Sequence, residues 1–217
     1  MKFFCNVLFF IPFFSSCTLV DIKKKQQSEH HQQHFLAVSH DISLECNGGD
    51  HCEKWKMWLQ ELVKKSHKHR ITHAYNMAAD ANTFKAKNFG ELLNHSKGIV
   101  ISYDDYHCLD GQISCTFLDE KKIYFNKLSL SLNKIEWMRV FWHEVFHLIY
   151  PQIPHISCRD CSDNKSITYQ ECDKSSFSSY GIELFWLAAH AKKFSSDKKF
   201  NQNNEVALKD LKNRICR

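Results

Sequence analysis

Residues 133–151 read NKIEWMRVFWHEVFHLIYP, and this stretch decides how the centre of the chain folds. Asn133 is a favourable helix N-cap, and Glu136 stands at the third helical position, where its carboxylate can complete a capping box. The stretch ends at Pro151, which cannot continue a helix. It therefore predicts a helix from about residue 134 to Tyr150.

This helix carries the motif His143-Glu144-Val145-Phe146-His147, which has the form H-E-x-x-H. Side chains four residues apart lie on one face of a helix, so His143 and His147 can both reach one metal ion. Glu144 stands beside the first histidine and can take a proton from a water that zinc has acidified. Apolar residues flank the motif, and burying these polar groups among them costs free energy unless they are paired or metal-bound. The motif therefore predicts a zinc site with Glu144 as the base.

The segments around this helix predict an α+β fold. Alternating apolar and polar residues in 113–117 and 122–126 predict a hairpin directly before it. Periodicity marks four further elements, which are helices over 53–66, 71–87 and 180–194 and a strand over 99–101.

Residues 1–17 have the pattern of an export signal. Lys2 precedes an apolar run over 3–14, which is shorter than the ~20 residues that a membrane-spanning helix needs. The run ends in FSSC at 14–17, which resembles a bacterial lipobox and makes Cys17 a candidate for a lipid anchor. A plain signal peptide cut nearby is the alternative. We expect export to the bacterial cell envelope or secretion, with no transmembrane helix in the mature chain.

The rest of the chain divides into a tether and one domain. Residues 18–40 are polar and read as a flexible tether, which leaves 41–217 as a single domain. A chain of 217 residues is long enough for one sizeable core. The net charge of +5 is small, and no basic cluster is interleaved with aromatic residues. Nucleic acid is therefore not an expected partner.

Cysteine usage predicts disulfides. Two of the 10 cysteines fall in the signal, and the remaining eight form an even set in an exported chain. Cys46 with Cys52, and Cys108 with Cys115, are close pairs around glycine-containing turns and are expected to bridge locally. The last four either bridge one another or form a structural zinc site; they are Cys158, Cys161, Cys172 and Cys216.

The motif and its setting resemble the zincin superfamily of zinc metallopeptidases, over roughly residues 110–194, although only the motif itself is specific. The resemblance implies a zincin-like fold, with a small mixed or antiparallel sheet and a further helix after the motif helix. It implies that His143 and His147 bind Zn²⁺ and that Glu144 is the general base. It also implies that the hairpin over 113–126 holds an extended peptide by strand addition.

The motif does not fix a third zinc ligand. The metzincin branch of the family has a glycine and a histidine at positions that here are Tyr150 and Ile153, while His155 follows two residues later in a loop bracketed by prolines. The gluzincin branch uses a glutamate from a later helix, here Glu183, whose apolar neighbours favour a cationic partner. Another branch uses an aspartate near a Tyr-Gly dipeptide, which points to Asp173. We expect His155 as the ligand, with Glu183 as the main alternative.

These patterns predict an exported zinc-dependent metallopeptidase that acts on a peptide or protein substrate. Tyr150 or Tyr180 could donate a hydrogen bond to the oxyanion that develops during hydrolysis, although packing is the simpler role for each. Two other functions stay open. One is a binding protein with the same fold and an inactive metal site, and the other is a disulfide-rich surface protein in which the motif is coincidental.

Overall fold

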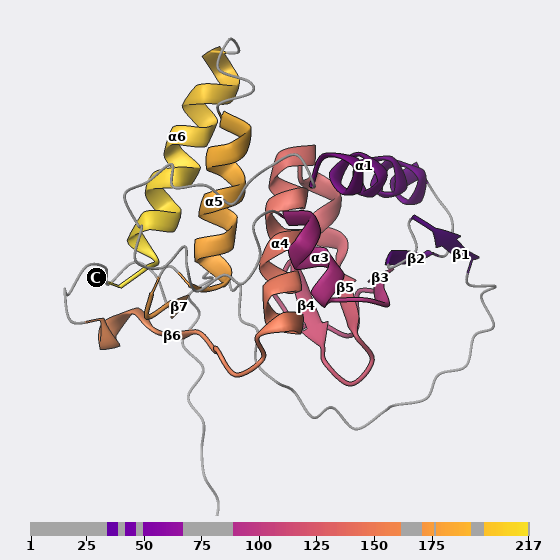
Figure 1. Cartoon of the computed structure of the whole chain (residues 1–217), viewed down its shortest axis with the longest axis horizontal. Coiled ribbons are helices and arrows are strands. Elements are labelled where there is room, and N and C mark those ends of the chain that lie inside the picture. The colour runs from indigo at the N-terminus through magenta and orange to yellow at the C-terminus, as the bar shows by residue number, and fades with distance from the viewer. Residues whose placement is uncertain are drawn as a thin grey trace, which may run out of the picture.

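The computed structural model describes residues 34–38, 42–46, 50–66, 89–161, 171–175, 177–191 and 198–216. These parts of the chain form a mixed α+β fold, as the sequence predicts, with helices stacked beside a small sheet (Figure 1). The export signal and the helix expected over 71–87 lie outside the described residues. None of the described helices is long and apolar enough to cross a membrane.

A mixed five-stranded sheet forms the centre of the fold. Its strands are β1 (His34–Ala37), β2 (Ile42–Cys46), β3 (Ile99–Tyr103), β4 (Ser114–Phe117) and β5 (Lys122–Phe125). The order across the sheet is β1-β2-β3-β5-β4. The three central strands run parallel, and the edge strands β1 and β4 are each antiparallel to their neighbour. The hairpin expected before the motif helix is confirmed as β4 and β5.

The tether expected over 18–40 is too long at its C-terminal end. β1 lies inside that range and pairs in antiparallel register with β2, with Leu36 opposite Leu44. The polar composition of the preceding residues masked the short apolar run over 35–38, which is long enough for one edge strand. The folded part of the chain therefore begins no later than His34.

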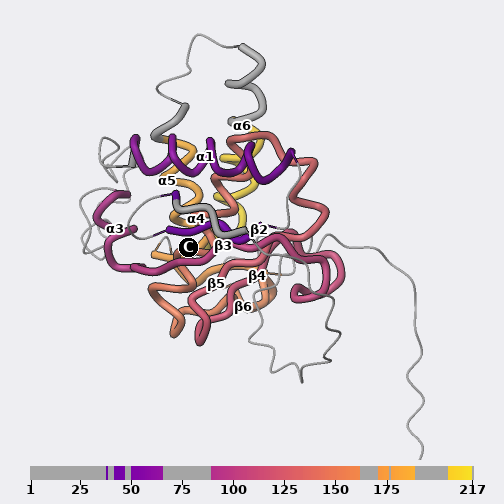
Figure 2. Tube along the Cα trace, turned by 90° about the vertical axis from the view of Figure 1, so that its right-hand side faces the viewer, coloured from indigo at the N-terminus to yellow at the C-terminus, as the bar shows by residue number. Residues whose placement is uncertain are grey.

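Helices pack against one face of the sheet and against one another (Figures 1 and 2). They are α1 (Asp50–Ser66), α3 (Phe89–His95), α4 (Lys134–Ile149), α5 (Ser179–Ala191) and α6 (Lys198–Asn213). Short elements complete the chain, namely the 3-10 turns η1 (Lys127–Ser131) and η2 (Cys158–Asp160) and the strands β6 (Ile156–Ser157) and β7 (Glu171–Cys172). The sequence anticipates α1, α4 and α5 but not α3 or α6.

Helix α4, which carries the motif, is fixed at its start and along its buried face. Asn133 accepts hydrogen bonds from the backbone of Ile135 and Glu136, and the Glu136 side chain accepts one from the backbone of Asn133, which completes the expected capping box. One turn later, Trp137 stacks on Phe125 of β5 at 4.7 Å between ring centroids. The capping box and this stacking therefore fix the position of the motif relative to the sheet.

The register of the hairpin decides what β4 presents to this helix. Ser114 lies opposite Phe125, and Thr116 lies opposite Ile123. Phe125 and Ile123 point into the core beneath the helices. Because partners in register share a face of the sheet, Ser114 and Thr116 also point toward α4.

Four disulfides link the described residues. The two expected local pairs are confirmed, and Cα atoms lie 6.0 Å apart in Cys46–Cys52 and 5.5 Å apart in Cys108–Cys115. The late cysteines bridge one another as Cys158–Cys172 and Cys161–Cys216. This pairing uses up the thiolates that a structural zinc site would need.

Candidate metal centre

Three histidine side chains converge on one point beside α4. His143 and His147 come from successive turns of the helix, and His155 comes from the loop that follows Pro151. The Nε2 atom of His143 lies 3.1 Å from that of His155 and 3.3 Å from that of His147. The Nε2 atoms of His147 and His155 are 3.2 Å apart. The structure therefore brings the two motif histidines together with His155.

This spacing fits a tetrahedral zinc ion. Histidine nitrogen lies about 2.0–2.1 Å from zinc, so two nitrogens at tetrahedral angles around one ion are about 3.3 Å apart. The three Nε2 separations all lie close to that value. Imidazole nitrogen is also a ligand that zinc prefers. The donor set and its geometry thus both match zinc.

Hydrogen bonds on the outer side of the rings point to the same conclusion. The Nδ1 atom of His143 lies 2.6 Å from a carboxylate oxygen of Glu183, and that of His155 lies 2.7 Å from one of Asp173. Each Nδ1 must carry a proton to donate to its carboxylate, so in the neutral rings each Nε2 is an acceptor. Two acceptors that face each other cannot form a hydrogen bond, whereas a shared cation satisfies both. Carboxylates behind metal-binding histidines are the usual arrangement in proteins.

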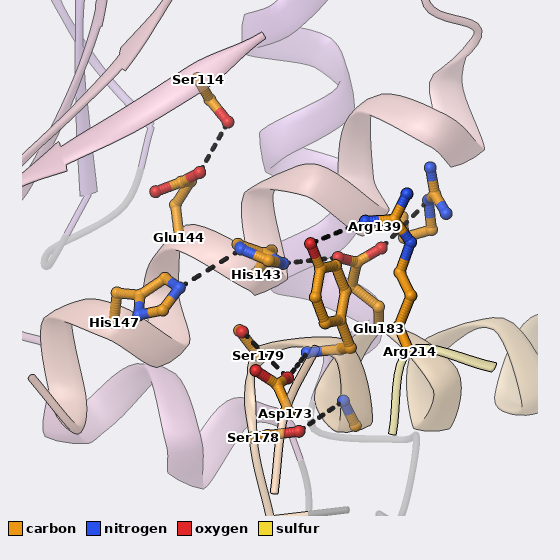
Figure 3. A network of polar contacts seen from close by, with 12 residues as sticks. Ser114, Arg139, His143, Glu144, His147, Asp173, Ser178, Ser179, Glu183 and Arg214 are labelled. Carbon is orange, nitrogen blue, oxygen red and sulfur yellow. Dashed lines mark hydrogen bonds and ion pairs between the residues drawn. The ribbon is translucent and has the colours of Figure 1, made fainter. Parts of the chain in front are cut away.

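Glu183 lies behind His143 and does not reach the convergence point. It enters from α5 and is 4% exposed. One of its oxygens contacts His143 Nδ1, and the other forms an ion pair with Arg139, 3.2 Å from Nε (Figure 3). Glu183 is thus placed to orient His143 rather than to join the three Nε2 atoms. Arg139 neutralises the buried carboxylate.

Asp173 has the corresponding position behind His155. Its second oxygen accepts hydrogen bonds from the backbone N–H of Tyr180, at 2.9 Å, and from the Ser179 hydroxyl, at 3.3 Å, in the first turn of α5 (Figure 3). Burial alone would raise the pKa of Asp173, but the contacts with His155 and Tyr180 hold this pKa below its ordinary value. Asp173 is therefore an ionised carboxylate that accepts from the His155 ring.

Burial and neighbouring charges shift the pKa values of His143 and His147. Burial and the charges of His143 and His155 lower the pKa of His147 well below its ordinary value. Burial acts in the same direction on His143, but the hydrogen bond and charge of Glu183 raise its pKa above the ordinary value. His147 is thus held neutral, which is the state that binds a metal.

Glu144 points from α4 toward the edge strand. Its carboxylate accepts a hydrogen bond from the Ser114 hydroxyl at 2.7 Å and from the Thr116 hydroxyl at 2.5 Å. Figure 3 shows Glu144 and Glu183 on opposite sides of His143. The two glutamates therefore have different surroundings, since one faces β4 and the other faces α5 and Arg139.

Tyr180 and Tyr150 both pack against rings of the motif helix. The Tyr180 hydroxyl accepts a hydrogen bond from Arg214 at 2.9 Å, and its ring packs on His143 and His155 with centroids 5.0 and 4.8 Å away. Tyr150 packs on Phe146. Tyr180 thus packs on the histidine rings and Tyr150 on the helix that carries the motif, and packing is the simpler role expected from the sequence.

Comparisons of this chain with protein-family models, curated proteins and solved structures found no match. The site therefore rests on its own geometry. Sequence reasoning did not anticipate Arg139, Ser114, Thr116 or Arg214. The spacing of Arg139 from His143 along one helix face was a usable signal for the first, but the other three depend on contacts between segments distant in sequence.

Proposed function

We propose that this protein is an exported zinc metallopeptidase. The observation that carries the proposal is the convergence of three Nε2 atoms, from His143, His147 and His155, with separations that suit one zinc ion. The carboxylates behind two of the rings support the proposal, because histidines that bind a metal usually donate their other ring N–H to such a group. We infer a zincin-like arrangement from the motif helix and the adjacent sheet edge.

In this proposal the side chains of the site have separate tasks. The three imidazoles hold the ion, and Glu183 and Asp173 fix the orientation of two of them. Zinc would supply Lewis acidity and make water acidic enough to lose a proton near neutral pH. Glu144, one residue after the first histidine, is the group that accepts this proton and later passes it to the leaving amine.

The position of β4 supports a peptide as the substrate. β4 is an edge strand, and among the described residues it pairs only with β5. An extended peptide could add to its outer side through backbone hydrogen bonds. The hydroxyls of Ser114 and Thr116 on this strand contact Glu144. A peptide bound along β4 would therefore lie close to the proposed base.

The proposal includes export. Four disulfides in the described part of the chain are typical of proteins that fold outside the reducing cytosol. Together with the signal-like start of the sequence, they support a location in the cell envelope or in the medium. Mass spectrometry of the N-terminal peptide tests the lipid anchor on Cys17, because an unmodified mature N-terminus at another residue would exclude the anchor.

Two substitutions test the peptidase itself. Glu144→Gln should reduce cleavage of fluorescent casein by about 10²–10⁴-fold, because an amide cannot accept the proton. It should leave one zinc per chain, because no ligand is lost. His147→Ala should remove both zinc and activity. Glu136→Gln is the matched control, since it alters a glutamate of the same helix and a glutamine can still complete the capping box.

Two results would contradict the proposal. Cleavage by Glu144→Gln at the wild-type rate would exclude Glu144 as the base. Wild-type protein that takes up no equimolar zinc would exclude the metal site. Zinc uptake without cleavage of any peptide library would instead favour a metal-binding protein without catalysis.

A further inference from the structure

We propose that the disulfides Cys158–Cys172 and Cys161–Cys216 strengthen metal binding at this centre. Together with the C-terminal segment 214–216, they hold His155 in position. This inference rests on the proposed zinc site and adds to it the contacts that position the third ligand, His155. His143 and His147 are held by α4, but His155 lies between a turn and a two-residue strand. Such a short pairing is not stable by itself.

The first connection joins the segment of His155 to the segment of Asp173. β6 and β7 are antiparallel, with Ile156 opposite Cys172. His155 precedes that pair on one strand and Asp173 follows it on the other, so the two side chains meet at 2.7 Å. The disulfide Cys158–Cys172 covalently links β7 to the first residue of η2, which directly follows β6, with Cα atoms 4.8 Å apart. Losing this bond would leave only the short β6–β7 pairing to hold the segment of His155 against the segment of its carboxylate partner.

The second connection fixes Asp173 from the other side. Its backbone N–H donates to the carbonyl of Arg214, and its carbonyl accepts from the backbone N–H of Cys216, both at 2.8 Å. These bonds form a parallel bridge between Asp173 and Ile215. Cys216 is in turn bonded to Cys161, shortly after η2. Figure 1 shows β6 and β7 beside the C-terminal end of the chain.

Arg214 extends this connection to the histidine rings. Its guanidinium donates to the Tyr180 hydroxyl at 2.9 Å, and the Tyr180 ring packs on both His143 and His155. The backbone of Arg214 holds Asp173, while its side chain holds the ring that covers the histidines. The C-terminal segment therefore contacts the site through both its backbone and its side chain.

The expected consequence is a loss of metal affinity when either disulfide is removed. The double variant Cys158→Ser/Cys172→Ser should bind zinc about 10–100-fold more weakly than wild type, the range found when groups that orient a ligand are lost. Cys161→Ser/Cys216→Ser should weaken binding in the same direction. The matched control is Cys46→Ser/Cys52→Ser, because that disulfide joins β2 to α1, which contribute no residue to the histidine cluster.

The test is a zinc competition titration of the full mature chain against a chromophoric chelator, with near-ultraviolet circular dichroism to select folded variants. A double-mutant cycle isolates the effect on His155. In a His155→Ala background, removing Cys158–Cys172 should cause little further loss, because the ligand that the disulfide positions is already absent.

The outcomes separate this inference from the proposed function. Wild-type zinc affinity in both late-disulfide variants would overturn the inference while leaving the zinc site intact. An equal loss in the Cys46–Cys52 control, or an undiminished loss in the His155→Ala background, would also overturn it. Failure of wild type to bind zinc would overturn both proposals. If one late-disulfide variant does not fold, the other provides the same comparison.

Discussion

His143 and Glu183 are joined by a contact of 2.6 Å between Nδ1 and a carboxylate oxygen. Because Nδ1 of His143 faces Glu183, the other ring nitrogen of His143, Nε2, faces His147 and His155. A glutamate that serves as a zinc ligand would instead have to approach those nitrogens. The geometry therefore favours His155 over Glu183 as the third ligand.

Replacing Glu183 tests this assignment. Glu183→Gln keeps an oxygen that can accept from His143 but removes the negative charge, so zinc affinity should fall about 10–100-fold while one zinc still binds. His155→Ala should cause the larger loss, because it removes a ligand. Competition titration of both variants provides the measurement. Abolished binding in the glutamine variant, with near-normal binding in His155→Ala, would make Glu183 the ligand.

The hydroxyls that contact Glu144 should affect turnover but not metal binding. Ser114→Ala combined with Thr116→Val removes both donors, so the carboxylate loses the groups that orient it. We expect kcat on a peptide substrate to fall about tenfold or more, since a misplaced base works poorly. Zinc content should be unchanged.

A conservative pair serves as the control for that experiment. Ser114→Thr with Thr116→Ser keeps a hydroxyl at each position and should retain most of the activity. Equal activity of the hydroxyl-free and hydroxyl-retaining variants would contradict the positioning role of β4.

Glu61 forms one ion pair within α1 and one with α4, and these pairs predict a pH dependence of stability. Burial alone would raise the pKa of Glu61, but Lys134 and Lys65 lower it to about 2. A carboxylate with a depressed pKa stabilises the fold above its unfolded value, near 4.5, and this contribution is lost as the pH falls from there toward 2. Because Glu61 is partly exposed, the effect should be below about 1 kcal/mol.

Urea unfolding of Glu61→Gln measures this contribution. The variant should be less stable than wild type at pH 7 and equal to it near pH 2, and the difference should shrink in high salt. A difference that persists unchanged at pH 2 would mean that Glu61 acts through packing and not through its charge.

The sequence predicts the elements that contain strong local signals. Capping residues and a terminating proline define α4, and alternating residues define the hairpin of β4 and β5. The disulfides Cys46–Cys52 and Cys108–Cys115 are predictable because only a short loop separates the two cysteines of each pair. α6 is harder to predict, because the apolar residues that it is seen to pack against the core, Ala207, Leu208 and Leu211, are few in a polar segment.

The residues of the candidate site also differ in how well the sequence predicts their positions. His143, Glu144 and His147 form a motif within one helix, so their common location follows from helix geometry. The positions of His155, Asp173 and Glu183 depend on how a loop, a short strand and a later helix pack around α4. The sequence left these three as competing ligands, whereas the structure places one at the convergence point and the other two behind histidine rings.

Zinc-edge X-ray absorption on the zinc-loaded wild-type protein tests the central claim most directly. The account predicts one zinc per chain, with three imidazole nitrogens at about 2.0–2.1 Å and no sulfur ligand. Scattering from sulfur at about 2.3 Å, or a first shell with fewer than three imidazoles, would contradict a centre built from His143, His147 and His155.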